Sequence, residues 1–406
     1  MTCARPGRAA SPSCRPFSPR TRRPTRPGGS WRRWRRREVK IVVVGGGIIG
    51  CATAYELART GCAVTLLERA TPGAEASGAA AGMLVPLGET ARSSFETLAI
   101  ASWRLFPQVA KDLRERTGID VEHVTRGTIY PLFTAEEIRR AEARAARHPG
   151  EEFGIAAWDA REVRDREPAL ATNVRGALFV RGDHWVNNQR LVAAYARAAV
   201  AAGVLLRSGL SVSRVVVEAG RARGVVADGE RVDGDVVLLA AGAWTGQLVG
   251  SFGGRLPVEP KRGQMLALTH VPPVLHHVVH AEDVYLVPRP SGELLVGATV
   301  ERVGFEGAVT AGAIAGLLRA ALELVPALGD LAITRTWYGF RPWVPDGFPV
   351  LGPWPGVDGL WVATAHFRNG ILLAPITARL MTAWITGGKP NMDVRDFLPD
   401  RFATAH

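Results

Sequence analysis

The chain has 406 residues, of which 47% are hydrophobic and 22% charged, so it can bury one large core or two adjoining ones. Its formal net charge of +12 is typical of nucleic-acid-binding proteins, but residues 1–37 contain twelve arginines and no lysine or acidic residue. These arginines account for the whole excess charge. The rest of the chain is neutral, and nucleic-acid binding is not expected to be its main function.

The first 38 residues are predicted to be a disordered extension rich in arginine and proline. They contain almost no aliphatic side chains and cannot bury enough apolar surface to fold. Their composition is also similar to that of a transit peptide, although six prolines before Gly28 oppose the amphipathic helix that such a peptide needs. In a different class of function, these arginines with Trp31 and Trp34 would bind nucleic acid, and the affinity would fall steeply with salt.

The first predicted elements form a βαβ unit with a glycine-rich turn. Residues 40–44 are a β-branched run typical of a buried strand, residues 51–60 suit a helix, and residues 63–67 predict a second strand that ends at Glu68. The turn between the first strand and the helix carries the motif described next.

Gly45, Gly47 and Gly50 fit the pattern G-x-G-x-x-G. Such glycines permit a tight turn, a close approach of the backbone to a pyrophosphate, and close helix–strand packing, while the helix N-terminus attracts the phosphates. Glu68 follows at the end of the second strand, where a carboxylate can accept hydrogen bonds from the ribose hydroxyls of an adenosine. Together these residues predict a dinucleotide-binding domain.

Downstream of this unit, the hydrophobic pattern predicts further elements as far as residue 385. Helices are expected at residues 93–117, 135–147, 187–202, 311–324 and 370–385, and strands at 121–132, 204–206, 212–217, 223–227, 236–240, 264–268, 284–288, 293–299 and 360–363. The three segments between residues 204 and 227 alternate like antiparallel strands.

Parallel units at both ends of the chain, with antiparallel sheet between them, predict an α/β fold in two domains. A discontinuous Rossmann-like domain binds the dinucleotide and carries an inserted α+β substrate domain with a mainly antiparallel sheet. We assign residues 39–115, 184–253 and 345–395 to the first domain, 116–183 and 254–344 to the second, and 396–406 to a C-terminal tail.

Three segments favour FAD over a nicotinamide cofactor. Residues 76–84 are small, which lets a bulky ring system lie against the backbone, and residues 236–246 end a predicted strand in Ala-Ala-Gly-Ala-Trp. Residues 366–375 run from a strand end into a helix N-terminus. The N–H groups and dipole of that helix suit the negative charge that a reduced flavin accumulates.

With these motifs in view, the chain resembles the D-amino-acid oxidase/sarcosine oxidase family of FAD-dependent amine oxidoreductases, and most closely its thiamine-pathway glycine oxidases. The resemblance covers about residues 39–395. Its most specific parts are AAAGML (79–84), YLVPRPSGELLVGAT (285–299), WYGFRP (337–342) and HFRNGILLAP (366–375).

The resemblance implies roles for particular side chains. Arg341 would bind the carboxylate of an amino acid bidentately, Arg368 would lie near the substrate and the flavin, and the Tyr285 hydroxyl would help to bind the carboxylate. Besides the three motif glycines, the residues implied to contact FAD are Ile48, Ile49, Glu68, Arg69, Ala76, Ser77, Ala81, Gly82, Met83, Val212, His366, Phe367, Arg368, Asn369, Gly370, Ile371 and Leu372.

The implied reaction is oxidative deamination of glycine or a similar small amino acid, such as sarcosine or a small D-amino acid, to an imino or oxo acid. Dioxygen would be the second substrate and hydrogen peroxide a product, and the reaction would feed thiamine thiazole synthesis in the cytoplasm. A sarcosine oxidase and a D-amino-acid dehydrogenase are the alternatives within the family. Some relatives attach the flavin through a cysteine in the C-terminal half; this chain has none after Cys62, so non-covalent FAD is expected.

One position departs from the family pattern. A histidine is expected two residues before Tyr285, but Asp283 stands there, and a carboxylate at that point would repel an anion. The preferred substrate is therefore left open. The four histidines within residues 270–280 lack metal-ligand spacing, so no metal is expected. No apolar stretch reaches the roughly 18 residues of a membrane span, and the sequence allows a homo-oligomer without indicating one.

Overall fold

The computed structural model describes residues 39–87, 93–147, 152–269 and 271–402, and the structural statements here concern these residues. From residue 38 onward the chain forms one compact unit. The predicted disordered extension, with Cys3 and Cys14, lies outside the described residues.

A six-stranded sheet carries the glycine-rich turn. Its strands, in spatial order, are β18 (Val350–Pro353), β19 (Leu360–Thr364), β12 (Val236–Leu239), β1 (Lys40–Val44), β2 (Ala63–Glu68) and β8 (Leu205–Ser208). All neighbours are parallel except the edge pair β18–β19, which is antiparallel. Parallel neighbours require crossover connections, so the sheet collects strands that are far apart in the sequence.

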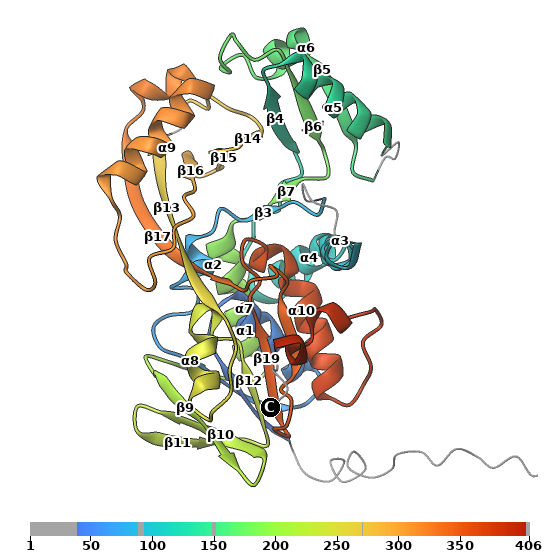
Figure 1. Ribbon diagram of the computed structural model, residues 1–406, viewed down its shortest axis with the longest axis vertical. Coiled ribbons are helices and arrows are strands. Elements are labelled where there is room, and N and C mark those ends of the chain that lie inside the picture. Colours follow the sequence, from blue (N-terminus) through green and yellow to red (C-terminus); the bar gives the residue numbers. More distant parts are fainter. Residues whose placement is uncertain (1–38, 88–92, 148–151, 270, 403–406) are drawn as a thin grey trace, which may run out of the picture. The chain divides into compact units, whose positions relative to one another are not determined.

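The two faces of this sheet are covered by different elements. Ile41 and Val43 of β1 pack on one face in a buried cluster with three helices. These helices, which lie together in Figure 1, are α1 (Ile48–Arg59), α7 (Asn188–Ala201) and α10 (Gly370–Ile385). Val42 and Val44 point to the other face and pack with α8 (Thr245–Gly250) and with a second, smaller sheet. Alternation along β1 thus buries both of its faces, as expected for a central parallel strand.

The smaller sheet is antiparallel and has the order β11–β10–β9. Its strands are β9 (Val212–Glu218), β10 (Arg221–Ala227) and β11 (Glu230–Asp233). The prediction of antiparallel strands is therefore confirmed for segments 212–217 and 223–227. It is wrong for segment 204–206, because β8 pairs in parallel with β2 at the edge of the six-stranded sheet. Local alternation does not show which sheet edge a strand joins.

An eight-stranded, mainly antiparallel sheet forms the second layer, as predicted. Its strands, in spatial order, are β17 (Ile333–Trp343), β13 (Glu259–Thr269), β16 (Glu293–Gly297), β15 (Tyr285–Pro288), β14 (Val278–His280), β4 (Thr128–Leu132), β6 (Gly176–Val180) and β5 (Ile155–Asp159). Only β14 and β4 pair in parallel. Figure 1 shows β13 and β17 as two long neighbouring strands. The residue bounds of the two domains stay a prediction.

Side chains alternate between the two faces of the eight-stranded sheet. Leu266 and Leu268 of β13 pack in a buried cluster with helix α9 (Ala311–Leu324). Met265 and Ala267, on the opposite face, pack in another cluster with Trp185. This second face presents Tyr285 on β15.

Several predicted elements differ from the observed ones. The helix expected over residues 93–117 is two helices, α3 (Ser93–Trp103) and α4 (Phe106–Thr117), and Pro107 lies in the first turn of α4, where a proline begins a helix more easily than it continues one. The strand expected over 121–132 is restricted to β4. Helix α5 (Ala135–Arg147) matches its prediction.

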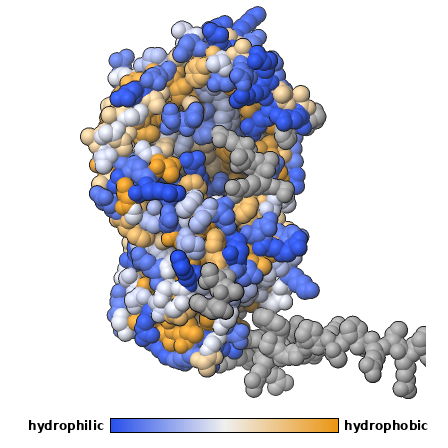
Figure 2. Space-filling view, in the orientation of Figure 1, coloured by the Kyte–Doolittle hydropathy of each residue, from blue (hydrophilic) through white to orange (hydrophobic). Residues whose placement is uncertain are grey.

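Some elements were not predicted at all. These helices and strands are α2 (Ala76–Ala79), β3 (Met83–Leu84), β5, α6 (Ala160–Arg166), β6, β7 (His184–Trp185), β11, α8, β14, β17 and β18. Most of them are short, and glycine or proline interrupts the strand pattern of β17 and β18. On the face shown in Figure 2, hydrophilic and hydrophobic residues are interspersed. No helix in the described part of the chain is long and apolar enough to cross a membrane.

Candidate active site

A cavity of about 490 Å³ lies at the carboxyl ends of the parallel strands. Val44, Glu68 and Thr364, which end β1, β2 and β19, line it. In open α/β sheets, ligands bind at this edge. Gly263 of β13 and Arg341 of β17 also line the cavity, so it lies where the two large sheets meet.

Most of the predicted site residues come together in this cavity. It is lined by Gly45, Gly47, Ile48, Ile49, Glu68, Arg69, Ala76, Ser77, Val212, Arg341, His366, Phe367, Arg368, Gly370 and Ile371. These residues are spread along the chain from the first strand to the last helix, so the fold has assembled one site from distant segments.

The glycine-rich turn leaves no room for side chains. Gly45 has a φ of +107°, and a Cβ added to it would lie 2.5 Å from the carbonyl oxygen of Ala240. A Cβ on Gly50 would lie 1.9 Å from the carbonyl oxygen of Gly45, so Gly50 allows α1 to pack tightly against β1. Gly47 is the N-cap of α1 and provides no side-chain cap. The start of α1 therefore faces the cavity through backbone, as phosphate binding requires.

Glu68 lies at the end of β2 and is 8% exposed. Its Oε2 accepts a hydrogen bond from the backbone N–H of Gly46 at 2.7 Å, and its Oε1 accepts one from Ala70 at 2.9 Å. These bonds hold the carboxylate at the cavity wall beside the glycine turn, where a ribose would lie. The neighbouring Arg69 stacks on the ring of Trp244, with 3.6 Å from its Cζ to the ring centroid, and forms an ion pair with Glu75.

A second backbone feature lies between β19 and α10. Ala365 and Phe367 have positive φ values of 61° and 48°, which is uncommon for residues with side chains and is found at functional sites. His366 between them is buried, and its Nε2 lies 3.1 Å from Thr377 Oγ1. Burial lowers the pKa of His366 to about 3, so the ring is neutral at physiological pH. Helix α10 begins at Gly370 without a side-chain cap, so its first N–H groups and its dipole are available to an anion.

Arg341, Tyr285 and Arg368 form a positively charged group at the second sheet. Burial raises the pKa of Tyr285, while the charge of Arg341, a hydrogen bond with it and the charge of Arg368 oppose that shift. Burial lowers the pKa of Arg341, and Arg368 lowers it further because like charges repel. The three side chains therefore interact, and their net charge attracts an anion such as a carboxylate.

Two glycines make room for these side chains. A Cβ on Gly263 would lie 2.1 Å from Arg341 Nη1, and a Cβ on Gly297 would lie 2.9 Å from Tyr285 Cε2. Tyr285 Oη also lies 3.6 Å from the sulfur of Met265. The sequence alone had not indicated Gly263, Gly297 or Met265, because the strand register that places them beside the arginine and the tyrosine is not visible in it.

Other predicted site residues do not line the cavity. They are Gly50, Ala81, Gly82, Met83, Tyr285, Asn369 and Leu372. Leu372 is buried in the helical core, and Gly82 packs with a φ of +74° against the carbonyl oxygen of Val186. Met83 pairs with Trp185 in a two-stranded sheet. Their assigned contacts with a cofactor stay predictions.

Residues 241–244 after β12 form a further wall of the cavity; the sequence analysis had named segment 236–246 as favouring FAD but had assigned none of these residues to the site. A signal for it existed, since this segment follows a buried strand of the parallel sheet and ligands bind at such strand ends. Asp283, which departs from the family pattern, is exposed and does not line the cavity, so its charge faces solvent.

The described histidines of segment 270–280 contact other parts of the protein. His276 is exposed, but its backbone N–H and that of His277 donate to buried Glu167, which also lies 2.6 Å from His277 Nδ1. His280 lies on β14 opposite Tyr285. Among the described residues, no group of three or more His, Cys, Asp or Glu side chains could hold a metal ion.

The fold and this cavity define a dinucleotide-binding redox protein, with Arg341 and Arg368 among the residues that line the cavity. The chain belongs to the FAD dependent oxidoreductase family, which matches residues 40–384. The predictions of the family, of the Rossmann-like fold with a second domain, and of FAD as cofactor are confirmed.

Glycine oxidases are among the individual proteins to which this chain is similar. The chain is 38% identical over 365 residues to glycine oxidase from Pseudomonas putida, covering 89% of this chain and 98% of that protein. It is 38% identical to the bifunctional protein ThiO/ThiG of a Synechocystis species, over 90% of this chain and 54% of that protein. It is similar to the crystal structure of glycine oxidase from Geobacillus kaustophilus, with a TM-score of 0.84, 34% identity, and coverage of 91% and 99% of the two chains.

Proposed function

We propose that this chain is an FAD-dependent oxidase that deaminates glycine, or a similarly small amino acid, with formation of hydrogen peroxide. One observation carries the proposal: Arg341 and Arg368 line the cavity that begins at the dinucleotide-binding turn, and both interact with the neighbouring Tyr285. Two guanidinium groups and a phenol suit one carboxylate held next to a redox cofactor. The similarity to glycine oxidases supports a small amino acid as substrate.

Residues at the carboxyl ends of the strands of the six-stranded sheet are suited to hold FAD. The backbone at Gly45 and Gly47 with the start of α1 would bind the pyrophosphate, Glu68 would bind the adenosine ribose, and the start of α10 would stabilise negative charge on the reduced ring. When bound, FAD supplies chemistry that side chains lack, since it accepts a hydride from the substrate and passes electrons to dioxygen.

The side chains position the substrate and polarise it. The planar fork of Arg341 would bind the carboxylate with two parallel hydrogen bonds and so orient the Cα–H bond. Tyr285 keeps its proton, because burial raises its pKa, and can donate a hydrogen bond to the same carboxylate. His366 is a poor general base, because its pKa is about 3 and its Nε2 is engaged with Thr377. The amine of the substrate would therefore bind in its neutral form.

Substrate identity is tested by anaerobic flavin bleaching with glycine, sarcosine, D-alanine and D-proline in turn. Rapid bleaching by glycine supports the proposal, whereas faster bleaching by sarcosine indicates a sarcosine oxidase. Hydrogen peroxide formed in air indicates an oxidase. Reduction of a dye under argon without peroxide formation in air indicates a D-amino-acid dehydrogenase. A protein that carries no flavin after incubation with excess FAD and removal of the unbound FAD would contradict the whole assignment.

The anion site is tested by Arg341→Ala. Loss of a buried, charge-assisted carboxylate contact is worth roughly 2–5 kcal/mol, so KM should rise at least about thirty-fold for every carboxylate substrate. The visible flavin spectrum should stay intact, because Arg341 is not among the residues that are expected to hold FAD. Unchanged kinetics would exclude Arg341 as the carboxylate ligand.

Pathway and location complete the proposal. The product would enter thiamine thiazole synthesis, which the similarity to ThiO/ThiG supports, and the reaction would take place in the cytoplasm. Dioxygen is the second substrate, and FAD is bound without a covalent link. A homo-oligomer is compatible with this function, and size-exclusion chromatography with light scattering would establish the oligomeric state.

A further inference from the structure

A polar network lies directly behind Arg341, at the base of the segment that joins β16 to α9. The backbone of this segment pairs with β13 beyond the end of β16: Arg262 N–H donates to Glu301 O at 3.1 Å, and Glu301 N–H donates to Arg262 O at 2.9 Å. Thr299 N–H donates to Gln264 O at 3.3 Å. The segment is therefore attached to β13, the long strand between β17 and β16 in the second sheet.

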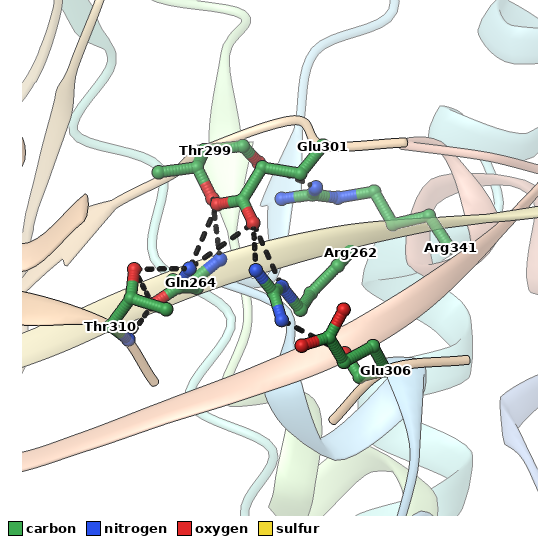
Figure 3. A network of polar contacts seen from close by, with 7 residues as sticks. All are labelled: Arg262, Gln264, Thr299, Glu301, Glu306, Thr310 and Arg341. Atoms are coloured by element: carbon green, nitrogen blue, oxygen red, sulfur yellow. Dashed lines mark hydrogen bonds and ion pairs between the residues drawn. The ribbon is translucent and has the colours of Figure 1, made fainter. Parts of the chain in front are cut away.

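The Glu301 carboxylate is the centre of this network (Figure 3). Its Oε2 accepts hydrogen bonds from Arg262 Nε at 2.8 Å and Arg262 Nη2 at 2.5 Å. Its Oε1 accepts from Thr299 Oγ1 at 2.5 Å and from Gln264 Nε2 at 2.9 Å. The Arg262 side chain is only 6% exposed, so this ion pair is largely removed from solvent and its two charges depend on each other.

The network extends to the proposed carboxylate-binding arginine through one residue. Arg341 Nη1 donates to the backbone oxygen of Thr299 at 2.9 Å. The Thr299 side chain both donates to Glu301 and accepts from Gln264 N–H at 2.9 Å, so the orientation of its peptide is fixed from two sides. One N–H of the guanidinium is thereby occupied and another interacts with Tyr285, so its remaining N–H donors are left for a ligand.

Electrostatics explain why Arg341 needs such a support. Arg368 repels it, and burial disfavours its charge, whereas the charge of Glu301 favours it. Burial alone would raise the pKa of Glu301, but hydrogen bonds from Thr299, Arg262 and Gln264 lower it below its ordinary value. Glu301 is therefore ionised throughout the physiological pH range and supplies a constant negative charge behind the anion site.

From this geometry we infer that Glu301, acting through Thr299, is a positioning residue for substrate binding: it holds Arg341 in the orientation that receives the carboxylate. The inference rests on the proposed function. It assigns to Glu301 no contact with the reacting atoms, so its removal should weaken binding of the carboxylate and leave the hydride-transfer step nearly unchanged.

The test uses Glu301→Gln in the FAD-loaded full chain, with glycolate as the probe, because glycolate keeps the carboxylate of glycine and has no amine to oxidise. Glycolate binding is followed at equilibrium by the change in flavin absorbance. We expect the dissociation constant of glycolate and the KM for glycine to rise together by about ten-fold, with kcat within about two-fold of wild type. Glu301→Asp, which keeps the charge, should recover part of the loss.

A matched control is available on the neighbouring strands. Glu293 of β16 accepts two hydrogen bonds from Arg335 of β17, at 2.9 and 3.1 Å, one on each carboxylate oxygen, and neither residue forms a hydrogen bond with Arg341 among the described residues. Glu293→Gln should lower the melting temperature without changing glycolate affinity. If Glu301→Gln does not fold with FAD, Thr299→Val, which removes only the hydroxyl link, should weaken glycolate binding about three-fold.

The outcomes separate this inference from the proposed function. A wild type that binds glycolate and oxidises glycine, together with an unchanged glycolate affinity in Glu301→Gln or Thr299→Val, overturns the inference alone. A loss of kcat without a change in affinity also overturns it, since a positioning role acts on binding. A wild type that neither binds glycolate nor oxidises any of the four amino acids overturns both.

Discussion

Gly263 limits where the guanidinium of Arg341 can lie. The two residues are on neighbouring strands, and the space that a Cβ would occupy on Gly263 is filled by Arg341 Nη1. Arg341 could be selected from the sequence through the resemblance of the motif WYGFRP to a known family, because the residues of that motif are consecutive. Gly263 belongs to another strand and carries no side chain, so no local pattern could single it out. The same holds for Thr299 and Glu301, whose contacts with Arg341 and Arg262 depend on the end of β16.

Replacement of Gly263 by alanine should displace Arg341. The new methyl group would lie 2.1 Å from Nη1, so the arginine must move while the backbone is unaffected. We expect KM for glycine to rise by about ten-fold, which corresponds to roughly 1.4 kcal/mol, with normal flavin content. Steady-state kinetics and flavin absorbance measure both quantities.

Gly316→Ala is the control for this substitution. Gly316 lies in α9 with nothing within 4 Å of the added Cβ, so alanine there should leave KM unchanged and stabilise the helix by roughly 0.5–1 kcal/mol. Equal kinetic effects of both variants would show that Gly263 has no special relation to Arg341.

Elements built from local signals were predicted well, and elements that depend on pairing were not. Helix α7 begins after Asn187, whose side chain accepts from Arg190 N–H, and such a cap can be recognised in the sequence. Strand β8 was expected to pair in an antiparallel sheet with the two strands that follow it. It pairs in parallel with β2 instead, because the fold places it next to β2. Cross-strand partners are a property of the fold, and local propensity does not determine them.

The turn between β6 and β7 contains a buried carboxyl group whose ionisation should affect stability. Asp183 is 2% exposed, accepts a hydrogen bond from Tyr130 at 2.6 Å, and its Oδ1 has no partner among the described residues. Burial raises its pKa to about 7 from an ordinary value of 3.8, although the Tyr130 bond and the charge of Arg144 oppose this. The folded chain therefore retains a proton that the unfolded chain loses between these pH values.

Stability should fall as the pH rises through this window. The folded chain has the higher pKa for Asp183, so the contribution of this residue to the free energy of unfolding is complete below about pH 4. It is lost as the pH rises toward 7, by up to about 1.4 kcal/mol per pH unit for one proton. Asp183→Asn keeps an acceptor for Tyr130 and cannot ionise. Its melting temperature should match that of wild type below about pH 4, where Asp183 is protonated in both the folded and the unfolded chain, and exceed it at pH 8. A difference that does not depend on pH would contradict this assignment.

For the whole molecule, the charge and the fold belong to different parts of the chain. The twelve arginines lie before residue 38, and the compact unit begins at that residue. A chain of residues 38–406 should therefore bind FAD and oxidise glycine with unchanged kcat and KM. Any salt-dependent affinity for DNA, measured by fluorescence anisotropy, should be present only in the full chain. Loss of flavin from the shortened chain would show that the arginine-rich segment supports the fold.

The sequence by itself determined the dinucleotide-binding turn and the acid that follows it, because steric and hydrogen-bonding requirements act there between residues that are near one another in the chain. Arg341 and Arg368 were indicated by the resemblance of their motifs to a known family. Only the tertiary structure decided that the carboxyl ends of β1, β2 and β19 meet β13 and β17 around one cavity, and that Thr299 and Glu301 support Arg341. Those contacts depend on strand order, register and crossovers, which arise when the two sheets pack and have no counterpart in local sequence.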